Sequence, residues 1–107
     1  MRLIGKITEL GIDLDEHDFV VKEAIVTADR IAIDWTEYDA PFSLVAHSEN
    51  NGQTYTGNYG IDKPNNNCVM EITRYSGPNK SILLLAKWYE SDSGRTGSSL
   101  IVLKREA

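Results

Sequence analysis

Acidic side chains that could hold a metal ion gather first in residues 13–18. The segment contains Asp13, Asp15, Glu16 and Asp18, with His17 among them. Calcium is bound by several carboxylate and carbonyl oxygens, so alternating acids in a loop are a candidate ligand set. The standard calcium-binding loop would need Asn or Asp at position 17, glycine at 18 and glutamate at 24. The chain has His17, Asp18 and Ala24 there, and we predict a solvated acidic loop and no metal site; a non-standard site with His17 as a zinc ligand is the less favoured alternative.

A second acidic segment spans residues 34–39 and contains Asp34, Glu37 and Asp39. Two carboxyl groups can share acid–base work when burial raises the pKa of one of them. Nothing in the sequence places a second carboxylate at the separation that glycosidases use. We therefore interpret these residues as turn chemistry and an acidic rim.

Nucleophilic chemistry has few candidates, since the chain has two histidines and one cysteine. Cys68 shares an apolar row with Met70 and Ile72, where cysteine usually acts as a small hydrophobic residue. Residues 94–99 are similar to a phosphate loop but lack its lysine and the helix that follows it. We predict no catalytic residue and no cofactor. An enzyme, in which carboxylates or His47 meet in the fold, is the least favoured hypothesis.

Aromatic side chains are spread along the chain rather than clustered. In the segment Thr54–Tyr59, Tyr55, Gly57 and Tyr59 fall on one face of a strand, because side chains alternate faces with a period of two. If the sheet closes, aromatic and polar side chains would line a lumen suited to a small apolar or planar ligand. The predicted ligand-binding residues are Trp35, His47, Tyr55, Asn58, Tyr59, Arg74 and Trp88.

The net charge of −5 is unevenly distributed. Residues 1–62 contain twelve acidic and four basic residues, whereas residues 63–107 contain four and seven. An acidic chain argues against nucleic-acid binding, which needs a concentrated basic surface. It could instead engage a basic protein, as an inhibitor or immunity-type module does. The residues predicted for such a surface are Asp13, Asp15, Glu16, Asp18, Glu37 and Asp39.

Short β-type runs separated by turn residues cover nearly the whole chain. The expected strands are residues 2–9, 18–27, 30–36, 41–48, 53–60, 67–76, 80–90 and 98–105. Turn signals lie at residues 28–29, 50–52, 76–79 and 92–95, and residues 62–67 form a longer polar connection. A helix over residues 15–28 is the alternative for the second strand. Its β-branched residues, such as Val20 and Ile25, favour a strand, with at most one helical turn near residues 15–18.

This pattern predicts an all-β fold of about eight antiparallel strands, forming a small barrel or a barrel-like sandwich. The motif Tyr55-x-Gly57-x-Tyr59 and the late strand Lys87–Glu90 loosely resemble the calycin group of lipocalin- and avidin-type barrels. The resemblance spans the chain as an architecture only, and the lipocalin Gly-x-Trp signature is absent at Gly5-Lys6-Ile7. It therefore implies no ligand and no site residue.

A length of 107 residues predicts a single domain, residues 1–107. No stretch approaches the roughly 20 apolar residues that span a bilayer, and we expect no membrane association. The start of the chain becomes polar too early for a signal peptide, and the lone cysteine suits a reducing compartment, so we expect a cytoplasmic protein. The strands around Leu83 and Leu100 are apolar on both faces, which predicts a homodimer.

Overall fold

The computed structural model describes residues 3–10 and 16–105, and these form a closed antiparallel β-barrel of eight strands. The strands are β1 (Leu3–Leu10), β2 (Glu16–Val26), β3 (Arg30–Glu37), β4 (Ala40–His47), β5 (Thr54–Ile61), β6 (Asn65–Ser76), β7 (Ile82–Glu90) and β8 (Arg95–Arg105). One 3₁₀ turn, η1 (Pro78–Lys80), joins β6 to β7. The predicted fold class is confirmed, and the barrel is the alternative that holds.

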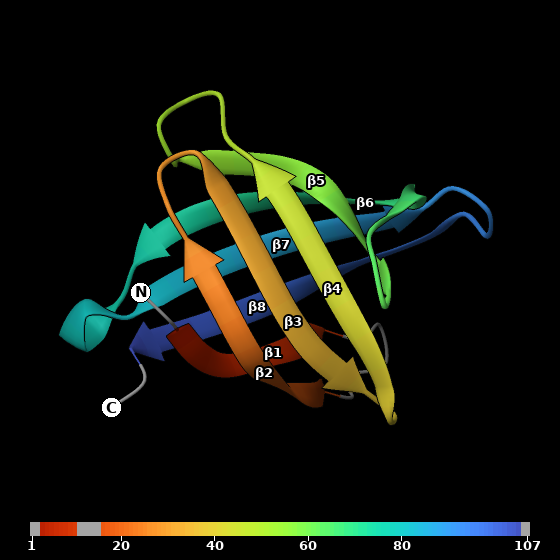
Figure 1. Ribbon diagram of the computed structural model, residues 1–107, viewed down its shortest axis with the longest axis horizontal. Coiled ribbons are helices and arrows are strands. Elements are labelled where there is room, and N and C mark those ends of the chain that lie inside the picture. The colour runs from red at the N-terminus through yellow and green to blue at the C-terminus, as the bar shows by residue number, and fades with distance from the viewer. Residues whose placement is uncertain (1–2, 11–15, 106–107) are drawn as a thin grey trace.

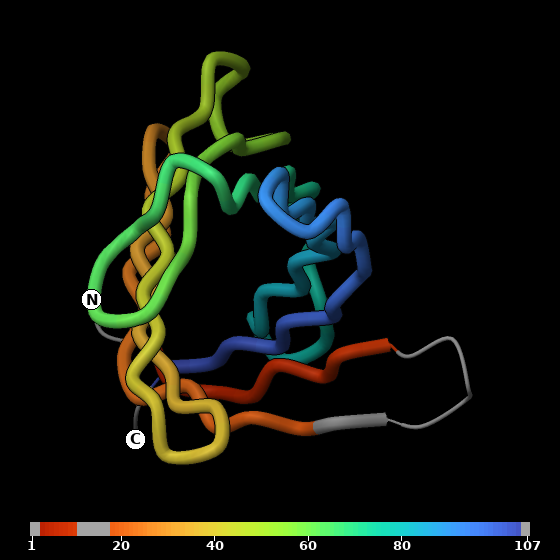
Figure 2. The backbone as a smooth tube through the Cα atoms, turned by 90° about the vertical axis from the view of Figure 1, so that its right-hand side faces the viewer, coloured from red at the N-terminus to blue at the C-terminus, as the bar shows by residue number. Residues whose placement is uncertain are grey.

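Every strand pairs with its neighbours in the chain, and β1 closes the ring against β8. In that closing pair Leu3 lies opposite Arg105 and Leu10 opposite Ser98. Figure 1 shows β2, β3 and β4 crossing in front of β6, β7 and β8, so that two curved walls face each other. Figure 2, turned by 90°, shows the orange and yellow β3–β4 wall opposite the blue β7–β8 wall, with red β1 between them below.

Inward- and outward-pointing side chains alternate along each strand, and the inward-pointing ones fill the barrel interior. On β3, for example, Ile31, Ile33 and Trp35 are buried while Arg30 and Asp34 are exposed. The same period places one face of every strand inward, as expected for a strand with one buried side. The interior residues form one hydrophobic cluster that draws on all eight strands.

The second strand extends without a helix from Glu16 to Val26, and Glu16–Asp18 pair with β1 in register. The strand interpretation of residues 16–26 is therefore correct, and the helical turn considered at residues 16–18 is wrong. A register shift between Val21 and Glu23 lets the strand follow the curvature of the barrel.

The connection between β5 and β6 is shorter than predicted. Residues 62–67 were expected to form it, but β6 begins at Asn65. The backbone carbonyl of Asn67 accepts hydrogen bonds from the amide and the hydroxyl of Ser91, at 2.8 and 3.2 Å. This pairing with the end of β7 holds the polar segment in an extended conformation.

The odd-numbered strands all run toward one end of the barrel, and the other end is plugged. At the plugged end the Tyr55 hydroxyl donates to the Thr27 carbonyl oxygen at 2.5 Å, and Arg74 Nη1 lies 3.4 Å from the same hydroxyl. Tyr55 is only 1% exposed. The opposite end, where β1, β3, β5 and β7 terminate, is the open mouth of the barrel.

Candidate functional site

A pocket of about 420 Å³ occupies the open end of the barrel. This volume lies within the range that small-molecule sites usually have. Its floor is apolar, formed by Ile7, Leu44, Met70 and Ile101. The remaining lining residues are Glu9, Phe19, Trp35, Glu37, Tyr38, Phe42, Tyr59, Trp88, Glu90, Arg95 and Ser99. We call this hollow the mouth pocket.

Aromatic rings form much of its wall, and two pairs of them are in contact. The Trp35 and Phe42 ring centroids lie 5.5 Å apart on the paired strands β3 and β4. Phe19 and Tyr38 meet edge to face at 5.6 Å and 78°. Such pairs contribute about 0.5–1.5 kcal/mol beyond the area that they bury. These contacts therefore favour the ring orientations that form the wall.

Trp88 completes the wall from β7 because it lies opposite a glycine. Gly97 pairs with Trp88 across the β7–β8 ladder, and a Cβ at position 97 would overlap the six-membered ring of the indole. The glycine thus provides the space in which the indole lies flat against β8. Only hydrogen fits at that position without moving Trp88.

A tight turn brings Tyr38 to the pocket. Tyr38 and Asp39 connect β3 to β4 with φ values of 48° and 68°. Two consecutive left-handed residues are typical of the two-residue hairpin turn that matches strand twist, where Asn and Gly are usual. Tyr38 is 78% exposed, yet its ring lines the pocket and contacts Phe19.

Three glutamates lie around the mouth, and one of them, Glu37, is held by an aromatic donor. Trp35 Nε1 donates to Glu37 Oε2 at 2.8 Å. Burial raises the pKa of Glu37 above its usual value, the hydrogen bond from Trp35 lowers it, and the charges of Glu9 and Glu90 raise it further. The charges of Glu9 and Glu90 thus act on Glu37 across the mouth.

Glu90 accepts hydrogen bonds on both oxygens. The Tyr59 hydroxyl donates to Oε2 at 3.1 Å and the Ser93 hydroxyl to Oε1 at 3.3 Å. Burial, followed by the nearby Glu90 carboxylate, raises the pKa of Tyr59 strongly. The phenol therefore stays protonated and acts as a donor at any physiological pH.

A wider hollow of about 820 Å³ adjoins the mouth along the β5–β6 turn. It shares Phe42, Tyr59 and Glu90 with the mouth pocket, and its other lining residues are mostly polar, such as Asn65 and Asn67. The shared residues make the two hollows continuous at the rim.

Three of the seven predicted ligand residues come together here, namely Trp35, Tyr59 and Trp88. Tyr55 and Arg74 lie at the plugged end. His47 is exposed on β4, and Asn58 donates from Nδ2 to the Cys68 carbonyl at 3.3 Å, with neither in the pocket lining. The predicted ligand set is thus divided between two ends and the outer surface.

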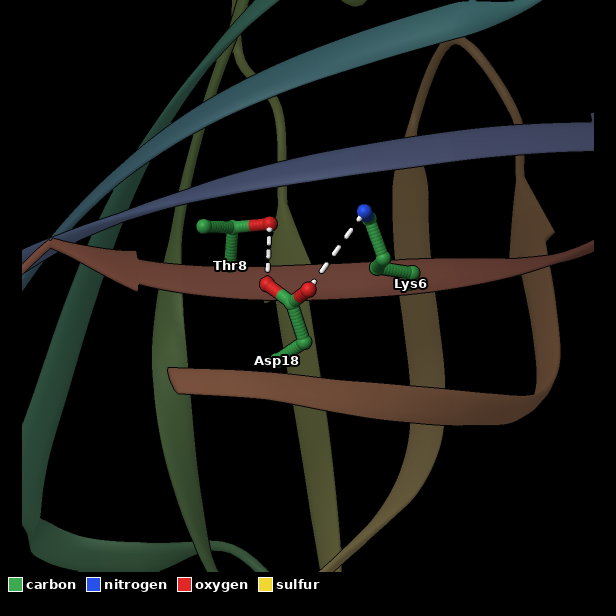
Figure 3. Close-up of polar contacts among 3 residues, drawn as sticks. All are labelled: Lys6, Thr8 and Asp18. Carbon is green, nitrogen blue, oxygen red and sulfur yellow. Dashed lines mark hydrogen bonds and ion pairs between the residues drawn. The ribbon is translucent and has the colours of Figure 1, made fainter. Parts of the chain in front are cut away.

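The residues predicted for a basic partner do not form one described surface. Asp13 and Asp15 lie outside the described residues, as does the side chain of Glu16. Figure 3 shows Asp18 engaged on the outer wall, where it accepts from the Thr8 hydroxyl at 2.9 Å and lies 3.5 Å from Lys6 Nζ. Glu37 lines the mouth pocket, while Asp39 is exposed in the adjoining turn.

Sequence reasoning missed several pocket residues, among them Glu9, Phe19, Phe42 and Glu90. Their signal was present in the alternation of the strands. Glu9 continues the inward row of Leu3 and Ile7, and Glu90 continues the row that includes Trp88. An apolar row that ends in a glutamate at the same end of three odd-numbered strands, β1, β3 and β7, marks a polar barrel mouth.

Among the described residues, no three His, Cys, Asp or Glu side chains are grouped so that they could hold a metal ion. Nor does this part of the chain contain a helix of the length and apolarity that crossing a membrane requires. Comparisons of the chain with protein-family models, curated proteins and solved structures find no match.

Proposed function

We propose that the protein is a non-catalytic binding protein that takes a small, partly apolar ligand into the mouth pocket. The observation that carries this proposal is the unfilled pocket of about 420 Å³ in a barrel whose other end is plugged. An eight-stranded barrel has an interior that side chains can fill or that can hold one small ligand. In this barrel, side chains fill one end of the interior, and the other end has room for a ligand.

The lining supports binding rather than a mere packing defect. The walls are large aromatic rings fixed by neighbours, as in the Trp35–Phe42 pair. Aromatic walls with a few polar groups are the usual composition of ligand sites. A rigid, partly desolvated pocket also requires little reorganisation on binding.

The polar groups at the mouth suit recognition better than reaction. Tyr59 is held protonated against Glu90, and Glu37 is bonded to Trp35. The pocket lining includes neither histidine nor cysteine. These contacts fix orientation without supplying a nucleophile activated by an adjacent base.

A probe experiment tests the proposal. N-phenyl-1-naphthylamine, a neutral planar fluorophore, should bind the wild-type protein and brighten, and Trp88→Ala should weaken its binding by about tenfold. Tyr89→Ala, which removes the next side chain on the outer face of β7, is the matched control and should bind as the wild type does.

Native mass spectrometry of the gently purified protein gives an independent readout. A retained ligand appears as extra mass that is lost on mild activation. Absence of both probe binding and retained mass would overturn the proposal. Equal loss of probe binding in the two variants would also count against the pocket as the site.

The acidic surface for a basic partner remains a prediction. No contact of the described residues favours it over the pocket, since Asp18 is paired with Lys6 and Glu37 faces the mouth. Capture of a basic protein at low salt, released at high salt, is the result that would support it.

A further inference from the structure

The charged groups of the mouth pocket are arranged by depth. Glu9, Glu37 and Glu90 lie at or next to the final residues of β1, β3 and β7, which all run toward the mouth. Arg95, the first residue of β8, is the one basic residue in the described lining. Three carboxylates therefore face one guanidinium around an opening whose floor is apolar.

We propose that the mouth pocket selects an organic cation, a primary ammonium or an amidinium attached to an apolar or planar body. This inference rests on the proposed binding function and names its ligand class. The body of the ligand lies among Trp35, Phe42 and Trp88, and its charged group lies at the level of the glutamates. The order of the lining, apolar below and acidic above, fixes this orientation.

The hydrogen-bonding capacity at the mouth matches a ligand that only donates. An ionised carboxylate accepts at both oxygens and an ammonium has three donors and no acceptor. Glu37 uses Oε2 for the Trp35 indole, and no other described residue hydrogen-bonds to its Oε1 or to the Glu9 carboxylate. These oxygens are the acceptors that the ligand would use. Charge-assisted bonds of this kind are about twice as strong as neutral ones.

Mutual repulsion among the glutamates favours the same ligand. Burial and the charges of Glu9 and Glu90 raise the pKa of Glu37. A bound cation offsets this repulsion and stabilises the ionised form of all three groups. The faces of the surrounding indole and phenol rings add a cation–π attraction for any positive group within about 6 Å.

A metal ion fits the arrangement less well. No three acidic, histidine or cysteine side chains of the described residues are grouped closely enough to hold one. A larger ammonium or amidinium can reach carboxylates that are too far apart to share a metal ion. The aromatic walls would also contribute nothing to a hard cation that prefers oxygen ligands.

Three naphthalene probes of nearly equal shape test the charge of the ligand by titration calorimetry. They are 1-naphthylmethylamine, 1-naphthylmethanol and 1-naphthoic acid, which are a cation, a neutral molecule and an anion at pH 7. We expect the amine to bind at least about tenfold more tightly than the alcohol, and the acid most weakly. Raising the salt concentration should weaken the binding of the amine but not that of the other two probes.

The possible outcomes distinguish a failure of cation selectivity from a failure of the proposed binding function. If none of the probes binds and no ligand is retained, the binding function fails. If the alcohol binds as tightly as the amine, the pocket binds ligands but does not select cations. If the acid binds most tightly, Arg95 dominates and the inference is wrong.

A double variant assigns the selectivity to the glutamates. Glu9→Gln with Glu37→Gln keeps the size of both side chains and one acceptor oxygen on each, but replaces the other oxygen with an amide donor and removes both charges. We expect the preference for amine over alcohol to fall about tenfold while alcohol binding changes less than about twofold. Unchanged alcohol binding shows that the variant is folded. An undiminished amine preference would overturn the inference.

Glu71→Gln is the matched control, because Glu71 is exposed on the outer face of β6. It removes one negative charge without touching the mouth pocket. The control should retain the full preference for the amine. A loss as large as in the double variant would show that overall charge, and not the pocket, attracts the cation, which would also overturn the inference.

Discussion

The indole N–H of Trp35 donates a 2.8 Å hydrogen bond to Glu37, two residues farther along the same strand. Residues i and i+2 of a strand share one face, so both side chains point into the barrel mouth. The bond fixes the indole plane as part of the wall and holds one carboxylate oxygen. It thereby links the aromatic and the acidic parts of the mouth pocket.

Glu37 should make stability fall as the pH rises above its ordinary pKa. Burial raises the pKa of Glu37 above 4.5, as do Glu9 and Glu90, whereas the Trp35 bond lowers it. The folded state then binds the proton more tightly than the unfolded state. The resulting stabilisation is present below about pH 4.5 and is lost as the pH rises through the folded-state pKa.

Glu37→Gln removes this titration and keeps an acceptor for Trp35. We expect the variant to gain stability relative to the wild type as the pH is raised from about 4.5 to 8. Urea unfolding at several pH values measures the difference, with Glu71→Gln as the control. Arg95 lines the same pocket, and if it neutralises Glu37 the difference will be the same at every pH, which would contradict the prediction.

Gly97→Ala should destabilise the barrel and move Trp88. The new Cβ would overlap the Trp88 indole, so the ring must leave the wall of the mouth pocket. Overpacking of this kind costs about 1–3 kcal/mol. Urea unfolding gives the loss, and a shift in tryptophan emission reports the moved ring. Thr96→Ala, at an exposed neighbouring position, should be close to wild type.

Cys68 should be a slow nucleophile. Burial raises the pKa of its thiol, and the carboxylates of Glu90 and Asp92 raise it further. Less thiolate is therefore present at pH 8 than for a free cysteine, and alkylation by iodoacetamide should be correspondingly slower. Glu90→Gln should speed the reaction by removing one of the charges. A rate that Glu90→Gln leaves unchanged would point to burial alone.

Substitutions on the outer face of β7 and β8 test the predicted homodimer. Leu83 and Leu85 are partly buried there, opposite Val102 and Leu100, and Leu100 is 37% exposed. Replacing Leu83 and Leu85 with lysine should convert a dimer to a monomer in sedimentation velocity. Lysines at Thr54 and Thr56, exposed on β5, are the control pair. A wild-type protein that sediments as a monomer would contradict the prediction.

The strands could be predicted because they alternate so regularly, whereas the site depends on barrel closure. Tyr55 and Tyr59 share a face as predicted, yet four residues at about 3.3 Å each separate them by about 13 Å along the strand. One therefore plugs the barrel and the other lines its mouth. Sequence periodicity gives the face of a residue but not the end of the barrel at which it lies.

The positions of the acidic residues at the mouth could not be predicted for the same reason. The sequence predicts a strand over residues 30–36, so Glu37 is expected in the connection that follows it, as part of an acidic rim. Strand β3 extends through Glu37, which places its side chain on the inward row of Trp35. Glu9 and Glu90 line the same pocket as Glu37 only because β1, β3 and β7 end together, which is a property of the closed ring rather than of any one segment.

The pairing of β1 with β8 sets an order of events in folding. Seven strand pairs join neighbours in the chain, and the eighth brings Thr8 opposite Leu100. The entropy lost on closing a loop rises with its length, so we expect the seam to be the last pair to form. Ile101→Val at the seam should therefore accelerate unfolding and leave the refolding rate unchanged, whereas Ile33→Val, equally buried in β3, should slow refolding. Stopped-flow measurements on the two variants would show which wall of the barrel belongs to the folding nucleus and which wall forms only after the transition state.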